Sequence, residues 1–325
     1  MVHLRRLLPS IRPYRRVFAA GFAAVFVSNY FRAQGPQYLR RGIDALGNGG
    51  SIAAVHRAIG LLLAVATASG VARYVMRETL NGASRRVETD LRDRLFQHFE
   101  RLSADFYDRF PTGDLMARAT NDLLAVRMVA GPALMYLSDT VVGATLMLPH
   151  MIHISPTLTG LALLPLVALP IGMVAFGQAI HHRTLRIQAA YADLTSAVHE
   201  NISGARIVRA YRQENAEIER FRTLNADYAA RNLALARVSG AFHPLLALLG
   251  GLGAVAVIWV GGRLVIQNTI TAGEFVAFGV YLVMLVWPMI ALGWVVNLVQ
   301  RGEASMGRLN VLFDARPAIR SPELP

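Results

Sequence analysis

Residues 274–299 read EFVAFGVYLVMLVWPMIALGWVVNLV, an apolar run whose single charged side chain, Glu274, stands at its first position. About 20 consecutive apolar residues suffice for a helix to cross the ~30 Å hydrocarbon core of a bilayer, so this run is long enough to span a membrane. Five further apolar runs occur at about residues 17–39, 53–79, 128–151, 157–180 and 240–266. The sequence therefore predicts an all-α membrane protein with six transmembrane helices.

The composition agrees with a membrane protein. The chain is 54% hydrophobic and only 17% charged, whereas soluble domains average about 25% charged residues. The net charge of +12 would suggest a nucleic-acid partner in a soluble protein. Here the arginines alternate with acids in blocks between the apolar runs, as in cytoplasmic loops, so we expect no nucleic acid as a partner. The absence of cysteine excludes disulfides, thiolate metal sites and cysteine nucleophiles.

The distribution of arginine predicts the orientation in the membrane. Arginines gather in residues 1–16, 81–127, 181–237 and 301–325, and the short connectors at the other ends of the spans hold almost none. Because basic loops remain on the inner side, both termini are expected in the cytoplasm and the chain in the cell inner (plasma) membrane. Residues 1–16, with leucines between five arginines, are predicted to form an amphipathic elbow helix on the inner membrane surface.

Two of the basic loops, residues 80–127 and 181–239, have the pattern of long helices. In the first, apolar residues recur at helical spacing at Val87, Leu91, Leu95, Phe99 and Leu102. Span two is therefore expected to continue past Arg101 as one helix of roughly 50 residues, about 75 Å long. In the second loop, a similar spacing links Leu185, Tyr191, Leu194, Val198, Ile202 and Ile207. The sequence predicts two helical hairpins, or stalks, that project far beyond the membrane.

Each stalk has a tip where the helical pattern breaks. The first tip reads FYDRFPTGDL over residues 106–115, where Pro111 and Gly113 interrupt the helix and Asp114 is placed to cap the next one. The second tip reads ENISGARIVRAYRQEN over residues 200–215. Taken on spacing alone, the first tip is a helix–turn–helix corner without further function.

The tips carry a family resemblance. FYDRFPTGDLMARATND, residues 106–122, resembles the first intracellular loop of ABC exporters, and HENISGARIVRAY, residues 199–211, resembles the second. The stretch from Trp287 through Trp294 to Leu309 is similar to span six and its exit in multidrug-type members. The resemblance covers essentially the whole chain, with the motifs in the family's order. It implies the type 1 transmembrane domain of an ABC exporter half-transporter, here residues 1–325, without its ATP-binding domain.

In that family, short coupling helices at the two tips fit into clefts on the ATP-binding domains. The resemblance places them at about 107–114 and 211–215. It implies contacts with the ATP-binding domain for Tyr107, Gly113, Asp114, Arg118, Asn121, Asp122, Glu200, Gly204, Tyr211 and Glu214. A stiff helix transmits displacement along its axis, which agrees with this role.

The family's nucleotide-binding motifs are not found in the sequence. A Walker A motif, Gly-x-x-x-x-Gly-Lys-Ser/Thr, is impossible because the chain has no lysine. We therefore expect no catalytic residues and no cofactor on this chain. ATP and Mg are expected to bind a partner ATP-binding domain that is either fused downstream of Pro325 or carried by a separate subunit.

Polar residues inside the spans are the candidates for a transport path, because they are costly in hydrocarbon. Asn29 and Arg32 share one face of span one, and Asp139 lies near the middle of span three. Gln178 and Asn297, with Trp287 and Trp294 as an aromatic wall, complete the candidate path. The alternatives are polar pairing across helices, an Arg32 that reaches the outer interface, and tryptophans that pack helices or form an interfacial belt. The histidine pairs at 150/153 and 181/182 lack neighbouring acids, so no metal site is expected.

The sequence hypothesis is an exporter of amphipathic compounds, drugs or lipids, that alternates access to a cavity shared by two transmembrane halves. The partners are a second half, identical or related, two ATP-binding domains and the lipid bilayer. Peptides or siderophores are the alternative cargo on the same scaffold. An ion-driven secondary transporter would instead show midplane acids and short loops, and a membrane-embedded enzyme would need converging catalytic side chains that the sequence does not show.

Overall fold

The structure is a computed structural model that describes residues 3–47 and 51–318, apart from the side chain of His243. Residues 1–2 of the expected elbow helix, part of the first connector and the end of the chain after Ala318 lie outside the described residues. Within the described ranges the chain is helical and contains no strand. This confirms the all-α class.

The helices follow the expected order along the chain. The elbow consists of η1 (His3–Leu7), α1 (Leu8–Ile11) and η2 (Arg12–Tyr14). The long helices are α2 (Arg15–Gly47), α3 (Ile52–Phe99), α7 (Leu134–Ile154), α8 (Pro156–Ser203), α10 (Glu214–Ala256) and α12 (Ala272–Phe313). The shorter ones are α4 (Ala104–Arg109), α5 (Thr112–Ala117), α6 (Leu123–Met128), α9 (Ala205–Ala210) and α11 (Gly262–Ile266). Three π-helical segments, η3 (Arg118–Asp122), η4 (Val129–Ala133) and η5 (Val257–Gly261), join their neighbours without a break.

Local signals set where these helices begin. Ser51 caps α3, because its hydroxyl accepts a hydrogen bond from Ala54 N. Thr271 and Glu274 form a capping box at the start of α12, in which each side chain accepts from the other residue's backbone N–H. Pro111 and Pro156 stand where a new helix begins, a position that favours proline because its missing N–H is not needed in the first turn.

The chain divides into two compact units. The first contains the chain up to Leu166 and from Gly253 onward, and the second is Val167–Leu252. Helices α8 and α10 each contribute residues to both units. The units are described separately below.

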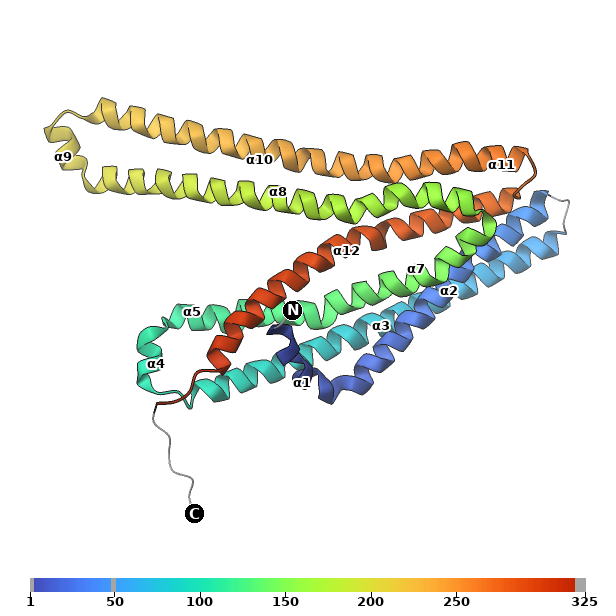
Figure 1. The fold of residues 1–325 in the computed structure, drawn as a ribbon, viewed down its shortest axis with the longest axis horizontal. Coiled ribbons are helices and arrows are strands. Elements are labelled where there is room, and N and C mark those ends of the chain that lie inside the picture. The colour runs from blue at the N-terminus through green and yellow to red at the C-terminus, as the bar shows by residue number, and fades with distance from the viewer. Residues whose placement is uncertain (1–2, 48–50, 319–325) are drawn as a thin grey trace, which may run out of the picture. The chain divides into compact units, whose positions relative to one another are not determined.

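The first unit is a helical bundle in which α2 runs antiparallel to α3 (Figure 1). Helix α2 also packs with α7 and α12, and α3 packs with α6 and η4. Its core holds fully buried Leu80 and Leu95 of α3, Leu123 of α6 and Met306 of α12. Small residues allow the close approaches, as expected for membrane helices. A Cβ on Gly21 would overlap the Leu80 side chain, and a Cβ on Gly302 would overlap Val129 Cγ2.

The second unit is a hairpin of α8 and α10 joined through α9 (Figure 1). Aromatic pairs link its arms, with ring centroids 5.5 Å apart for Phe176 and Phe242 and 5.8 Å apart for Tyr191 and Tyr228. The long helix predicted from residue 181 is confirmed as far as Ser203, where α8 ends before Gly204, but its apolar stripe is not buried within this unit. Ile202 is 72% exposed, and Ala190 and Ala197 are the buried residues on this part of α8.

Five helices in the described ranges are long and apolar enough to cross a membrane. They are Ile52–Phe99, Thr112–Ile154, Pro156–Ser203, Glu214–Ile266 and Ala272–Phe313. These include five of the six expected spans. The expected first span lies in α2, which is not among the five, because polar side chains such as Asn29, Arg32 and Gln34 interrupt its apolar surface.

The first stalk is confirmed as a continuation of span two, with small differences. Helix α3 ends at Phe99, two residues before Arg101, and its stripe at Val87, Leu91 and Leu95 is buried. The predicted cap at Asp114 is wrong. Pro111 occupies the N-cap position of α5 and Asp114 lies in its first turn, because the helix begins directly after the proline.

Close packing at Gly302 yields a testable prediction. Gly302→Ala should lower the melting temperature of the detergent-solubilised protein, since the added methyl group must displace Val129, and overpacking of this kind costs about 1–3 kcal/mol. Gly279→Ala in the same helix is the matched control, because its Cβ would meet no atom within 4 Å. Equal melting temperatures for the two variants would contradict this packing of α12 on the segment around Val129.

Candidate coupling tips and transport path

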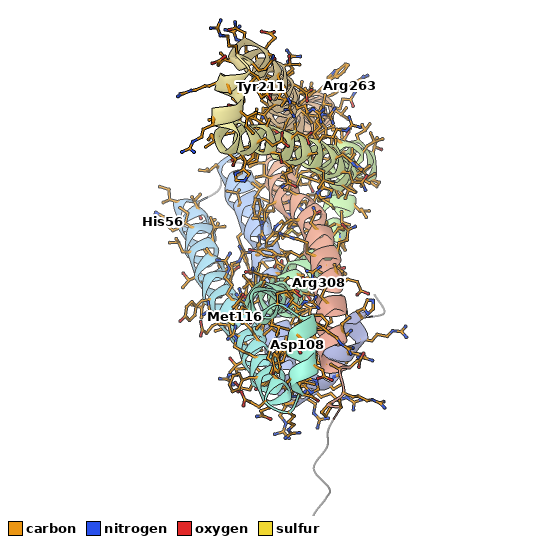
Figure 2. All side chains as sticks on the ribbon, turned by 90° about the vertical axis from the view of Figure 1, so that its left-hand side faces the viewer. His56, Asp108, Met116, Tyr211, Arg263 and Arg308 are labelled. Carbon is orange, nitrogen blue, oxygen red and sulfur yellow. The ribbon has the colours of Figure 1, made fainter. Side chains whose placement is uncertain are left out.

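The first tip is a compact aromatic corner. The rings of Phe106 and Phe110 pack in a tilted arrangement with centroids 4.8 Å apart, and Tyr107 Oη donates a 2.7 Å hydrogen bond to the carbonyl of Phe99. The short helix here is α4 (Ala104–Arg109), followed by a break at Phe110 and Pro111. The helix expected at 107–114 is therefore misplaced, because the proline ends it within the predicted range. Asp108 of α4 and Met116 of α5 are labelled in Figure 2, which looks onto this tip.

The charged residues of the first tip form a network with α12. Asp122 is 7% exposed and accepts two hydrogen bonds from Arg308, at 2.9 Å from Nε and 2.5 Å from Nη2. Arg118 pairs with Asp114 at 2.8 Å and donates to the carbonyl of Arg308 at 3.2 Å. These residues hold the first stalk to the end of α12. Tyr107, Gly113 and Asn121 remain exposed.

The pKa of Asp122 reflects this pairing. Burial raises the pKa of Asp122, but the hydrogen bonds from Arg308 and Ser305, with the charges of Arg308 and Arg118, outweigh burial and hold the pKa below its usual value. Asp122 is thus a carboxylate at neutral pH. Arg308 was not among the site residues expected from the sequence, because 186 positions separate it from its partner.

The second tip ends the hairpin of the second unit. Gly204 separates α8 from α9, and residues 211–213 form the turn into α10, with Arg212 at a φ of 50°. The helix expected at 211–215 is misplaced, since the short helix is α9 at Ala205–Ala210 and Glu214 already begins α10. Tyr211, labelled in Figure 2, is 73% exposed. A positive φ explains why no helix forms there.

Ion pairs and a hydrogen bond stiffen the base of the second tip. Glu200 pairs with Arg220 at 3.3 Å across the hairpin, and Asn201 Nδ2 donates to Glu217 at 3.2 Å. Glu200 therefore engages the opposite arm. Tyr211 and Glu214 are exposed and make no ion pair among the described residues, so these two candidates are free to meet a partner.

Within the spans, Asn29 and Asp139 are brought together. Asn29 is fully buried, and its Nδ2 donates to Asp139 Oδ1 at 2.7 Å and to the carbonyl of Val25 at 3.0 Å. Arg32 lies one turn further along α2 and donates to the carbonyl of Met284 at 3.3 Å. The alternative of polar pairing across helices is thus realised for Asn29 and Asp139, while Asp139 itself is half-buried.

The other path candidates are dispersed. Trp287 is 63% exposed, and Trp294 packs edge-to-face on Tyr136 with ring centroids 5.3 Å apart. Asn297 donates to the carbonyl of Gly293 in its own helix at 3.1 Å. Gln178 belongs to the second unit and the others belong to the first. The structure therefore joins Asn29 with Asp139 and does not bring the whole candidate set together.

Some polar contacts in the bundle were not predicted from the sequence. Ser28 and Ser69 exchange hydrogen bonds with each other's backbone carbonyls, at 3.3 and 3.1 Å, and Glu88 pairs with Arg127 at 3.2 Å. Serines in apolar runs often join membrane helices in this way, and this is the signal that would have identified the first pair. Among the described residues, no three histidines or acids cluster as metal ligands would.

Comparison with known proteins identifies the family. Residues 18–289 match the family described as ABC transporter transmembrane region. The chain belongs to this family. The match covers α2 from Phe18 and four of the five helices that are apolar enough to span a membrane, and it ends at residue 289 within the fifth, α12. The chain is therefore an ABC transporter transmembrane domain that crosses the membrane several times.

Curated relatives support this membership. The chain is 36% identical to a probable multidrug resistance ABC transporter ATP-binding/permease protein, YheI, of Bacillus subtilis, over 82% of this chain and 46% of that protein. It is 32% identical to the multidrug resistance-like ATP-binding protein MdlA of Escherichia coli, over 82% and 45% of the two chains. An ATP-dependent lipid A-core flippase of Desulfotalea psychrophila is 28% identical over 97% of this chain and 55% of its own. The chain spans about half the length of these relatives.

The Asp122–Arg308 pair yields a pH-dependent prediction. Asp122→Asn should destabilise this ABC transporter domain by about 1 kcal/mol at neutral pH, a value reduced because Arg308 is half exposed. Folding lowers the pKa of Asp122, so the ionised carboxylate stabilises the folded protein at every pH above the pKa of the unfolded chain. This stabilisation is lost as the pH falls through the pKa of the folded state. The difference in melting temperature should therefore be present at pH 7 and shrink below about pH 4.

Asp105→Asn, at an exposed position of α4, is the matched control and should change the melting temperature little at any pH. A difference for Asp122→Asn that stayed constant from pH 7 to about pH 3 would show that the Asp122 charge is not responsible.

Proposed function

We propose that this chain is the membrane-spanning part of an ATP-driven exporter of amphipathic compounds, drugs or lipids. Family membership and the names of the relatives, multidrug resistance proteins and lipid flippases, support this. The observation that carries the proposal is the pair of helical stalks with exposed residues at their tips. The proposed site of ATP hydrolysis is an ABC ATP-binding domain, which supplies ATP and Mg, and the residues of this chain take no part in the chemistry.

Coupling is proposed to run through the tips. In the first unit, the bidentate Asp122–Arg308 pair holds the stalk against α12. A displacement of α4 by a bound domain would therefore move span six as well as spans two and three. In the second unit, Tyr211 offers a large aromatic side chain at the end of two long helices. Exposed aromatic residues commonly anchor protein contacts. Both tips would fit clefts on ATP-binding domains on the cytoplasmic side, where the arginine distribution also predicts the termini.

Transport also needs a second transmembrane half, identical or related, to close the cavity. Within one chain, large apolar side chains remain exposed on the spans, for example Trp259 at 77% and Val283 at 71%. Lipid and the second half are the proposed cover for such surfaces, since water would not favour them. Peptides or siderophores are the second candidate cargo, which the family scaffold alone does not separate from drugs and lipids.

Tyr211 provides the test of coupling. In the native transporter that contains this sequence, reconstituted in liposomes, Tyr211→Ala should reduce ATP-driven transport of an amphipathic dye at least about tenfold while basal ATP hydrolysis continues. The physical reason is the loss of the aromatic anchor between the stalk and the ATP-binding domain. Leu185→Ala, at an exposed position in the middle of the same hairpin, is the control and should transport normally. Full transport by Tyr211→Ala would contradict the coupling role.

Asp139 provides the test of the path. Asp139→Asn preserves the side-chain shape but removes the charge next to Asn29, so the relative transport of cationic, neutral and anionic dyes should change, with cationic dyes losing most. Thr145→Val on the exposed side of α7 is the control. Unchanged rates for all three dyes would exclude Asp139 from the path and leave it as a residue that pairs α7 with α2.

A further inference from the structure

A cavity of about 360 Å³ lies where the elbow, α3 and the end of α12 meet. Two contacts hold these elements around it. Arg6 of the elbow donates to both carboxylate oxygens of Asp314 at 2.7 Å, and Arg94 of α3 donates to Ser10 at 3.2 Å. In Figure 1 the elbow crosses the bundle beside these two helices. The cavity belongs to neither the tips nor the candidate path.

The cavity is positively charged. Arg6, Arg94 and Arg101 all line it, together with His98. Asp314 neutralises Arg6, whereas Arg94 bonds to a neutral hydroxyl and Arg101 makes no ion pair among the described residues. Two guanidinium groups therefore face the cavity without a carboxylate partner. Concave sites lined by one sign of charge concentrate ligands of the opposite sign.

Two buried polar atoms in the wall have no hydrogen-bond partner. They are Nε2 of His98 and Oδ1 of Asn310, and Asn310 is only 6% exposed. Leaving a buried polar atom unpaired costs about 1–3 kcal/mol, so such atoms usually have a partner. Only four such atoms occur in the described residues, and two of them belong to residues that line this one cavity. A ligand that offers both a donor and acceptors would satisfy both.

We propose that this cavity binds a phosphate monoester. A phosphate presents several acceptor oxygens to converging arginines, and its protonated oxygen or a hydroxyl of the esterified alcohol can donate to Asn310. An ionised carboxylate offers no donor and fewer acceptor directions. Leu91, Met306 and Phe313 form an apolar wall for the ester's carbon atoms, and the volume falls in the range of small-molecule sites.

The phosphate could belong to a soluble ester or to a lipid headgroup, and the experiment separates the two sources. The purified chain in detergent is titrated with glycerol 3-phosphate and, as a neutral control, with glycerol, by calorimetry and by melting temperature. The same chain in nanodiscs of phosphatidylcholine with or without phosphatidic acid is analysed for bound lipid by native mass spectrometry. Binding of the soluble ester or selective retention of phosphatidic acid is the expected result.

Variants decide whether binding occurs in this cavity. Arg101→Gln should weaken binding at least about tenfold, the loss of one charge-assisted contact. Asn310→Asp should weaken it further, because a carboxylate then faces the phosphate. Arg85→Gln, which removes one exposed arginine from the same helix outside the cavity, should bind like the unmodified chain. Melting without ligand checks that each variant is folded.

Failure to bind either phosphate probe would overturn the proposal. Binding that all three variants retain, or that Arg85→Gln weakens as much as Arg101→Gln, would equally overturn it, because the anion would then be held by general surface charge. Neither result bears on coupling or transport, which are tested at Tyr211 and Asp139.

Discussion

The constraint behind this structure is that hydrocarbon offers no partner for backbone N–H and C=O groups. A chain that crosses it repeatedly must satisfy each of these groups within its own helices. The described residues obey this rule in the spans, where the few irregularities are π-helical segments, not loops. The same helices continue without a break into the stalks, as α3 does from Ile52 to Phe99. Helices such as α3 are therefore unbroken from their apolar part into their polar part, and this gives the stalks a rigid backbone.

A rigid stalk can transmit a displacement only if its ends are held by neighbouring elements. In the first unit, the Asp122–Arg308 pair, Arg118 and the buried stripe of α3 hold the stalk against the end of α12. The elbow adds a second tie to the same region through Arg6 and Asp314. Several residues expected to contact a partner thus maintain the shape of the stalk. Among the residues expected to contact a partner, Tyr107 and Tyr211 keep large exposed side chains.

Much of the fold was predictable because it follows local rules. Long apolar runs give spans, arginine blocks give stalks, and Pro111 marks the first break. Gly113 was also expected to interrupt the helix, but it lies inside α5, because that helix begins directly after Pro111. Details that depend on distant partners were not predictable. The short helices lie at Ala104–Arg109 and Ala205–Ala210, a few residues before their expected positions, because the proline and the positive φ of Arg212 end them early. The stripe on α8 has helical spacing but is not buried within its unit, since spacing shows a face and not what covers it.

The sequence by itself determined the class of the protein, the order of its helices and its family, because hydropathy, charge blocks and tip motifs are carried by neighbouring residues. Only the tertiary structure decided which polar side chains meet. Asn29 finds Asp139 across 110 positions, Asp122 finds Arg308 across 186, and the elbow closes a cationic cavity with helices almost 90 and 300 residues away. The physical reason is that such pairs depend on how whole helices pack. The residues next to each partner in the sequence do not indicate which distant side chain it will contact.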